Sequence, residues 1–177
     1  LSSSWTAKDN DALKKWFADY INWMQTSEFG KLESKTGNNH EVYYFAQLAS
    51  FSLYNNDLAT AKMAVENGKR MIDEQITADG TMPREIKRTR SSHYSLYGLK
   101  AFCILASCGE VVGIDLWNYR TTDGRSIKTP IDFILPYLLK DKSWSWPNVG
   151  DDMDKDITNS ILFIRPASKA YKTKELQ

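Results

Sequence analysis

The sequence has few of the residues that usually bind metals or form disulfides. Only two of its 177 residues are cysteines and two are histidines, and no CxxC or HExxH spacing occurs. A zinc site is therefore not expected. Cys103 and Cys108 lie five residues apart in an apolar stretch. On a helix their Cα atoms would be roughly 8 Å apart, which is too far for an easy disulfide, so both are expected to be buried thiols.

Net charge and long apolar runs are also scarce. The formal net charge is +1, which argues against general nucleic-acid binding because that needs a strongly basic face. Affinity for a polyanion would have to come from local clusters. No apolar run is expected to be long enough to span a bilayer, so no membrane partner is expected. The first five residues have neither a basic nor an apolar signal region, so a signal peptide is expected to be absent or already removed.

What remains is the composition of one ordinary globular domain. Hydrophobic residues make up 42% of the chain and charged residues 25%, which is typical of a folded, soluble protein. A chain of this length can bury a sizeable core. We therefore expect a single domain over residues 1–177.

The hydrophobic pattern predicts helices throughout. Strict alternation is missing, while apolar residues recur at steps of three and four. The first predicted helix runs from about Asp9 to Ser27 and is closed by Gly30, the second runs from near His40 or Glu41 to Asn55, and the third runs from the N-cap Asp57 to Ile76. The fourth runs from Ser91 or Ser92 and ends near Gly109 to Gly113. The fifth runs from about Ser126 to Leu139 with a break or kink at Pro130 and Pro136, and the last from near Ile157 to Tyr171.

These five or six helices predict an all-α fold of antiparallel helical hairpins. Two stretches, 42–53 and 99–106, are hydrophobic around much of the helix circumference. Such helices need cover on more than one side. Six helices cannot easily provide that cover for one another, which indicates a missing partner or a missing half.

Two segments place polar groups where core residues would otherwise be expected. One is 38–47, Asn-Asn-His-Glu-Val-Tyr-Tyr-Phe-Ala-Gln. The other is 83–97, which begins Pro-Arg-Glu-Ile-Lys-Arg-Thr-Arg and brings four cations within seven residues. Together they bring amides, imidazoles, guanidinium groups and phenols to the mouths of two helical hairpins.

These segments resemble the alginate lyase superfamily. Asn38-Asn39-His40 followed by Tyr44 and Gln47 is similar to its NNH…WY…Q signature, and 83–95 is similar to its P-x-E-x-x-R-T-R-S-x-x-Y-S signature. Further matches follow in family order at 75–80, 113–117 and 123–126. The resemblance implies the C-terminal half of an (α/α) toroid, incomplete without an N-terminal half, that cleaves alginate or glucuronan by β-elimination.

Such chemistry explains why these residue types are needed. The C5 proton of a uronate is a very weak acid because the neighbouring carboxylate is already negative. Hydrogen bonds and positive charge around that carboxylate stabilise the enolate-like intermediate. A base must then take the C5 proton, and an acid must protonate the leaving O4.

The resemblance also implies roles for single residues. Asn39 and an arginine would neutralise the carboxylate, with Arg88 the first choice and Arg90 the second. Tyr94 would be the base, the acid or both, and His40 a second acid/base or a further neutralising group. The phenol of a free tyrosine has a pKa of about 10, so such a base needs nearby cations. The residues expected to bind substrate are Tyr44, Gln47, Arg84, Arg90 and Tyr97; no metal or other cofactor is required by this chemistry.

Structural roles compete with these functional ones. Asn39 is an ordinary N-cap candidate, and Tyr94 and Tyr97 would by default be core aromatics. The basic segment would by default be a solvated face, and His93 is more typical of a structural residue. For the tryptophans that could stack on sugars, packing is the safer interpretation; these are Trp117, Trp144 and Trp146.

Two departures from the family pattern bear on function. Glu41 stands where the family commonly has glycine, so it could raise a local pKa, repel a polyuronate or point away. The family's preceding helical half, with its own histidine-containing motif, is not found in the sequence. The partners expected from the resemblance are therefore an acidic polysaccharide and an N-terminal half of the same precursor, in a secreted or periplasmic setting.

Two other functions remain open from the sequence. One is a non-catalytic member that binds acidic sugar or is only structural. The other is a toroid glycoside hydrolase, which needs two carboxylic acids across a cleft. The available acids are Glu41, Glu85, Asp115 and Asp123, and none of them has a signature pairing.

Overall fold

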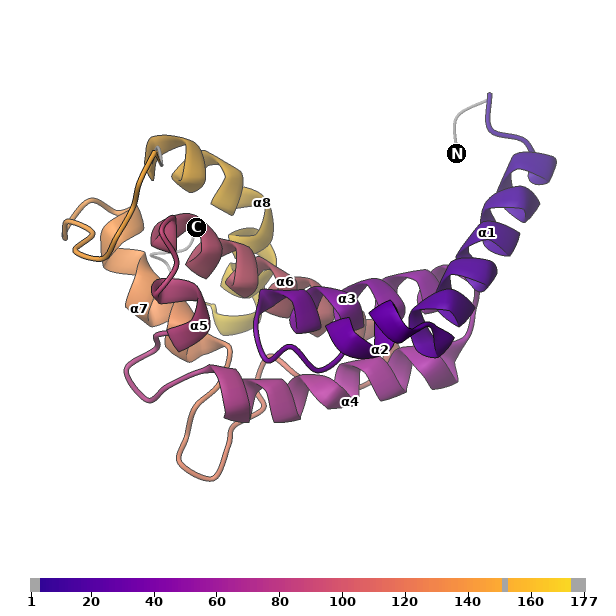
Figure 1. Cartoon of the computed structure of the whole chain (residues 1–177), viewed down its shortest axis with the longest axis horizontal. Coiled ribbons are helices and arrows are strands. Elements are labelled where there is room, and N and C mark those ends of the chain that lie inside the picture. Colours follow the sequence, from indigo (N-terminus) through magenta and orange to yellow (C-terminus); the bar gives the residue numbers. More distant parts are fainter. Residues whose placement is uncertain (1–3, 151–152, 173–177) are drawn as a thin grey trace.

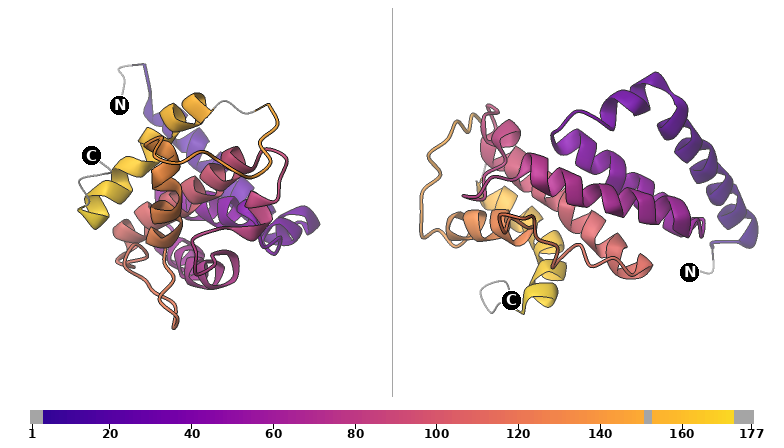
Figure 2. Two further views of the ribbon diagram at one scale, coloured as in Figure 1. Left: turned by 90° about the vertical axis from the view of Figure 1, so that its left-hand side faces the viewer. Right: turned by 90° about the horizontal axis from the view of Figure 1, so that it is seen from below.

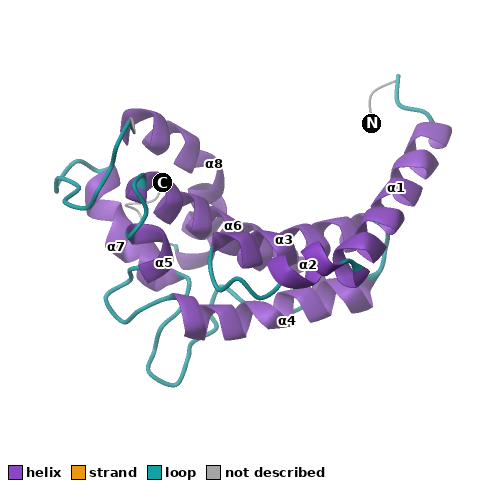
Figure 3. Cartoon of the chain, in the orientation of Figure 1, coloured by secondary structure: helices purple, strands orange, loops and turns teal. Residues whose placement is uncertain are grey.

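The computed structural model describes residues 4–150 and 153–172. Helices and loops make up this part of the chain, with no strand and one isolated bridge between Arg90 and Asn148 (Figure 3). The helices are α1 Ala7–Thr26, α2 Glu28–Glu33, α3 Asn39–Tyr54, α4 Leu58–Gln75, α5 Pro83–Ile86, α6 Ser91–Val112, α7 Lys128–Leu138 and α8 Met153–Tyr171. The predicted all-α class is confirmed.

Most predicted helix ends are confirmed by the residues that cap them. The side chain of Asp57 accepts a hydrogen bond from the backbone of Thr60 at 3.0 Å and starts α4. Gly113 ends α6 in the left-handed conformation, with φ 75°. Two details were wrong. Ser27, not Gly30, separates α1 from the next helix, and the N-cap of α3 is Asn38, so Asn39 is its first helical residue.

The sequence pattern missed α2 and α5 and predicted a break in α7. Both missed helices are too short, at six and four residues, for a helical period to show. Helix α7 is continuous. Pro130 stands in its first turn, where a missing N–H costs little, and Pro136 is close to its end.

Helices α3 and α6 form the centre of the molecule (Figures 1 and 2). They pack on each other and on α4, while α1 packs on α3 and α8 packs on α6. Their fully buried side chains include Leu48 of α3 with Leu99 and Phe102 of α6. This accounts for the broad hydrophobic circumference of both helices, because each is covered on more than one side.

Helix α6 also has the length and composition of a membrane-spanning segment. The sequence-based expectation that no run was long enough was therefore too strict. Two thirds of its apolar window, 67%, is buried within the protein. A central core helix has the same composition, so packing accounts for this apolar character.

The helices follow an open arc. Helix α1 rises from one end of the α3–α4–α6 layer and α8 from the other, and the N-terminal end of α1 stands clear of the remaining helices (Figure 1). Helix α1 packs on α2 and α3 only through part of its surface, which leaves Trp16 55% and Trp23 46% exposed. Large aromatic side chains at this exposure make α1 a helix with an uncovered face.

Candidate active site

The start of α3 lies at the centre of the candidate site. The side chain of Asn38 accepts a hydrogen bond from the backbone N–H of His40 at 3.0 Å, and its carbonyl accepts from Glu41 at 3.0 Å. The N–H of Asn39 is taken by Glu85 Oε1 at 2.6 Å, and the Asn39 Nδ2 donates to Glu85 Oε2 at 2.8 Å. The free N–H groups of the first turn are thus satisfied, and Asn39 and His40 are held in place.

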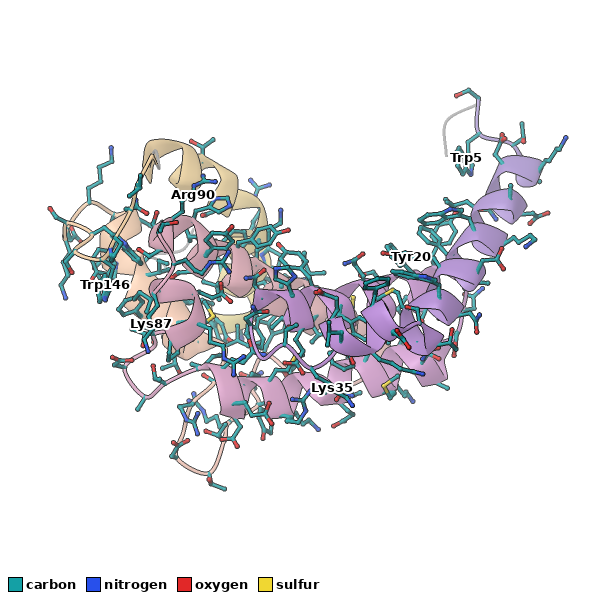
Figure 4. The ribbon with its side chains drawn as sticks, viewed as in Figure 1. Trp5, Tyr20, Lys35, Lys87, Arg90 and Trp146 are labelled. Carbon is teal, nitrogen blue, oxygen red and sulfur yellow. The ribbon has the colours of Figure 1, made fainter. Side chains whose placement is uncertain are left out.

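A cavity of about 330 Å³ opens beside this helix start. Its wall comes from α1, α2, α3 and α6 and is largely aromatic. The lining residues are Tyr20, Trp23, Met24, Gly30, Glu33, Asn39, His40, Tyr43, Tyr44, Gln47 and Tyr97. Figure 4 shows Tyr20 on the side of α1 that faces the inside of the arc. The cavity therefore combines ring surfaces with a small number of polar groups, as sites for sugars and other small ligands do.

Helix α2 closes one side of this cavity because of a close approach at Gly30. A Cβ there would lie 1.9 Å from the carbonyl oxygen of Met24, so only glycine lets the chain turn this tightly after α1. The turn brings Glu33 to the cavity, where its Oε2 lies 2.8 Å from Nδ1 of His40. This contact favours a proton on Nδ1 and leaves Nε2 of the neutral imidazole as an acceptor.

Two tyrosines of the wall are buried phenols. Burial raises the pKa of Tyr43 and also that of Tyr44, and the neighbouring Tyr97 raises the pKa of Tyr43 further. The ring of Tyr97 packs on Tyr43 at 4.3 Å and on His93 at 5.9 Å between centroids. Tyr43 and Tyr44 therefore remain protonated near neutral pH and serve as wall, with the Tyr44 hydroxyl donating to the carbonyl of Met24 at 3.2 Å.

The structure divides the predicted site residues into two groups. Five of them line the cavity, namely Asn39, His40, Tyr44, Gln47 and Tyr97. The remaining four lie outside its wall, namely Arg84, Arg88, Arg90 and Tyr94. Residues three apart share a helix face, so Tyr94 lies one turn before the wall residue Tyr97 along α6.

The residues outside the wall have contacts of their own. The guanidinium group of Arg88 lies over the ring of Tyr94, 4.0 Å from its centroid. Arg84 donates to the carbonyl of Thr36 and thereby holds the loop that precedes Asn38. Arg90 is exposed at the N-cap of α6. Figure 4 places Arg90 and Lys87 at the far end of the molecule from Tyr20, and no residue of the basic segment 84–90 lines the cavity.

Glu41 points away from the cavity, which is one of the three possibilities that its position in the sequence left open. It is 1% exposed. Its carboxylate accepts from Arg70 at 2.6 Å, from Gln75 at 3.0 Å and from the N–H of Gly37 at 3.0 Å. Glu41 therefore ties α3 to α4 and to the preceding loop, on the side of α3 that does not line the cavity.

Sequence reasoning missed several parts of the site. Glu33 and Glu85 were not identified as partners of His40 and Asn39, nor were Tyr20 and Trp23 identified as cavity wall. A signal existed only for Glu85, which is the glutamate of the quoted P-x-E pattern. The contact of Glu85 with Asn39 spans 46 residues, so local periodicity could not reveal it.

Other candidates have structural surroundings. Trp117 is buried, with its Nε1 donating to Glu110 at 2.7 Å. Trp144 and Trp146 pack on each other and on Phe133. Both cysteines are free and buried as predicted, and burial raises the pKa of each thiol. Within residues 4–150 and 153–172 no group of three potential ligands could hold a metal ion.

The cavity wall, among the described residues, contains one carboxylate, that of Glu33. Glu41 and Glu85 are buried beside α3, and Asp115 and Asp123 do not line the cavity. A pair of acids facing across this cavity, as a glycoside hydrolase requires, is therefore not present in the described part of the chain.

Comparisons with known proteins agree on one family. Residues 1–144 match the family model of alginate lyase. The whole fold is similar to the crystal structure of an alginate lyase from Bacteroides ovatus, with a TM-score of 0.90 and 28% sequence identity. The match covers 99% of this chain and 46% of that one, so the chain spans about half the length of that structure. No curated protein matches the chain.

Proposed function

Because the chain belongs to the alginate lyase family, whose members have a helical-toroid fold, we propose that it cleaves a uronate-containing polysaccharide by β-elimination. The observation that carries this proposal is the start of α3. It places the amide of Asn39 and the imidazole of His40 side by side on the wall of an aromatic cavity. One helical turn before the wall residue Tyr97, the ring of Tyr94 contacts the guanidinium group of Arg88. These are the group types that carboxylate stabilisation and proton transfer require.

The proposed reaction is a proton abstraction at C5 followed by elimination of O4. A base takes the C5 proton. The electron pair of the broken C5–H bond moves into the C5–carboxylate unit and gives an enolate-like dianion. The C4–O4 bond then breaks, a C4=C5 double bond forms, and O4 leaves with a proton. Asn39 donates to the carboxylate as its negative charge grows, and Arg88 adds positive charge beside Tyr94. Tyr94 exchanges the proton, and Nε2 of His40 is the second acid/base group.

The aromatic wall supports a sugar polymer as substrate. Tyr20, Trp23 and Tyr97 offer flat ring surfaces to pyranose rings. Lys87 and Arg90 of the basic segment lie at the far end of the molecule from Tyr20 (Figure 4). An acidic chain extending from the cavity towards that segment would meet positive charge, which favours its binding even though the net charge of the protein is only +1. An alginate or a glucuronan meets these requirements, in a secreted or periplasmic setting.

A further helical half completes the toroid in this proposal. Two observations support it: the chain spans 46% of the related structure, and α1 carries exposed aromatic side chains at Trp16 and Trp23. A second half packed on α1 would cover this face and give the cavity an opposite wall. It would also offer a second set of polar groups to the sugar.

The alternative is a member that binds acidic sugar without cleaving it. The observation that favours it is the position of Tyr94 and Arg88 outside the cavity wall. In a binding protein, Asn39 and His40 would contact a uronate while the phenol of Tyr94 would never reach C5. Binding without product formation distinguishes this alternative.

The test follows the ultraviolet absorbance of the unsaturated product on several polyuronates, with the chain alone and with a complementary half supplied. Replacement of Tyr94 by Phe should lower kcat by about 100- to 10,000-fold, because a phenyl ring cannot transfer a proton. Tyr171→Phe is the matched control, since the phenol of Tyr171, on α8, donates to the backbone carbonyl of Trp117 and does not line the cavity. Absence of product from the wild type under every condition would exclude the enzyme.

A further inference from the structure

Glu85, on the short helix α5, is hydrogen-bonded to a single residue at the start of α3, Asn39. Its Oε1 accepts from the backbone of Asn39 at 2.6 Å and its Oε2 accepts from Nδ2 of Asn39 at 2.8 Å. Glu85 is 2% exposed and Asn39 3%. No residue of 4–150 or 153–172 forms an ion pair with Glu85, so the hydrogen bonds to its carboxylate come from Asn39.

The chemistry of the two side chains fixes the orientation of the Asn39 amide. An ionised carboxylate only accepts hydrogen bonds, whereas the amide has two N–H donors on Nδ2 and an acceptor on Oδ1. Glu85 therefore faces Nδ2 and would repel Oδ1. Because the amide is planar, committing one N–H to Glu85 sets the plane of the group. The second N–H of Nδ2 then remains to serve a ligand in the cavity that Asn39 lines.

Helix α5 gives Glu85 a rigid base. Next to Glu85, Arg84 donates to the carbonyl of Thr36 in the loop before α3. On its other side α5 packs against α6, and Cγ of Glu85 lies 3.6 Å from the position that a Cβ at Gly98 would take, which is van der Waals distance. The carboxylate is thus held between the loop and α6, with little freedom to follow Asn39 if that side chain moves.

We infer that Glu85 is a positioning residue, which holds the free N–H of Asn39 towards the uronate carboxylate before the substrate arrives. This inference rests on the proposed function. A donor fixed in advance needs no reorganisation when the carboxylate gains its second negative charge, so its effect is larger on turnover than on binding. Glu85 itself contacts neither the substrate nor the reacting atoms.

Glu41 provides a matched control. It is also a buried glutamate that accepts a backbone N–H, that of Gly37, at the start of α3. Its other partners are Arg70 and Gln75, on the side away from the cavity. A glutamate that serves only stability should behave like Glu41 in every measurement.

The experiment compares Glu85→Gln with Glu41→Gln in the full chain. Glutamine keeps one acceptor for the N–H of Asn39, but its own NH₂ group cannot accept from Nδ2, so the Asn39 amide must turn or lose its partner. We expect Glu85→Gln to lower kcat by about 100-fold with a much smaller change in KM. Glu41→Gln should keep kcat while lowering the unfolding temperature. Equal kcat values in the two variants would overturn the inference.

A second measurement does not depend on turnover. The side-chain amide of Asn39, assigned by ¹⁵N NMR with the Asn39→Asp variant, should shift in Glu85→Gln and stay unchanged in Glu41→Gln. An unmoved amide in Glu85→Gln would overturn the inference even if activity fell. Failure of the proposed function would be observed differently, because the wild type itself would then give no unsaturated product on any polyuronate.

Discussion

Two buried glutamates beside the start of α3 differ in what their partners can do. Glu41 meets Arg70, Gln75 and a backbone N–H, so its charge is paired within the fold. Among the residues that the structure describes, the hydrogen bonds to the carboxylate of Glu85 come from the backbone and side chain of Asn39, a residue that also lines the cavity. The same side chain type therefore fastens two helices in one place and orients a site residue in the other. Burial alone does not distinguish the two roles.

The two asparagines at the start of α3 differ in a similar way. Asn38 caps α3 by accepting from the backbone of His40, and Asn39 presents its amide to Glu85 and the cavity. Of these two consecutive asparagines, Asn38 therefore serves the fold and Asn39 serves the candidate site.

The largest expected effect separates these two asparagines. Asn39→Ala should lower kcat on a polyuronate by about 100- to 1,000-fold, because it removes a donor to the developing charge. Asn38→Ala should lower the free energy of unfolding by about 1 kcal/mol through loss of the cap, with little change in kcat. Product absorbance and urea unfolding measure the two effects. A similar loss of kcat in both variants would mean that the helix start, not the amide, controls turnover.

A second prediction concerns the pair that fastens α3 to α4. Arg70 is 42% exposed and bonds to both Glu41 and Glu74. Arg70→Met would leave the buried Glu41 carboxylate with only its neutral donors, and should lower the free energy of unfolding by about 2 kcal/mol. Denaturant unfolding measures this loss. Turnover below the unfolding transition should be unchanged, and a fall in kcat would place Glu41 in the site after all.

The sequence predicted the helices well where the pattern is long and local. The course of α1, α3, α4 and α6 follows from apolar spacing, and the start of α4 follows from its capping residue Asp57. It could not predict α2 and α5, because four to six residues carry no period. These two short helices position Glu33 and Glu85, so the pattern failed at the elements that orient the site.

The sequence predicted some residues of the candidate site, but not which residues hold them in place. The family motifs pointed to Asn39, His40 and Tyr94, and the first two do line the cavity. The partners of these residues come from other segments, since Glu33 reaches His40 through a tight turn at Gly30 and Glu85 reaches Asn39 across 46 residues. Such contacts depend on how helices pack, which residue spacing does not describe.

The smallest expected effect belongs to a third carboxylate, Asp123, in the exposed turn before α7. Hydrogen bonds from Arg125 and Thr121 lower its pKa to about 2. A carboxyl with a depressed pKa stabilises the fold at pH values above its unfolded pKa of about 3.9, and this contribution is lost as the pH falls towards 2. Asp123→Asn should therefore flatten the pH dependence of stability slightly between about pH 4 and pH 2. A ¹³C titration of the carboxyl measures the pKa directly. Because the side chain of Asp123 is 53% exposed, solvent screening keeps its effect on stability below those of Glu41 and Glu85. An effect as large as theirs would show that the partners of a carboxylate, and not its burial, decide how much it contributes to stability.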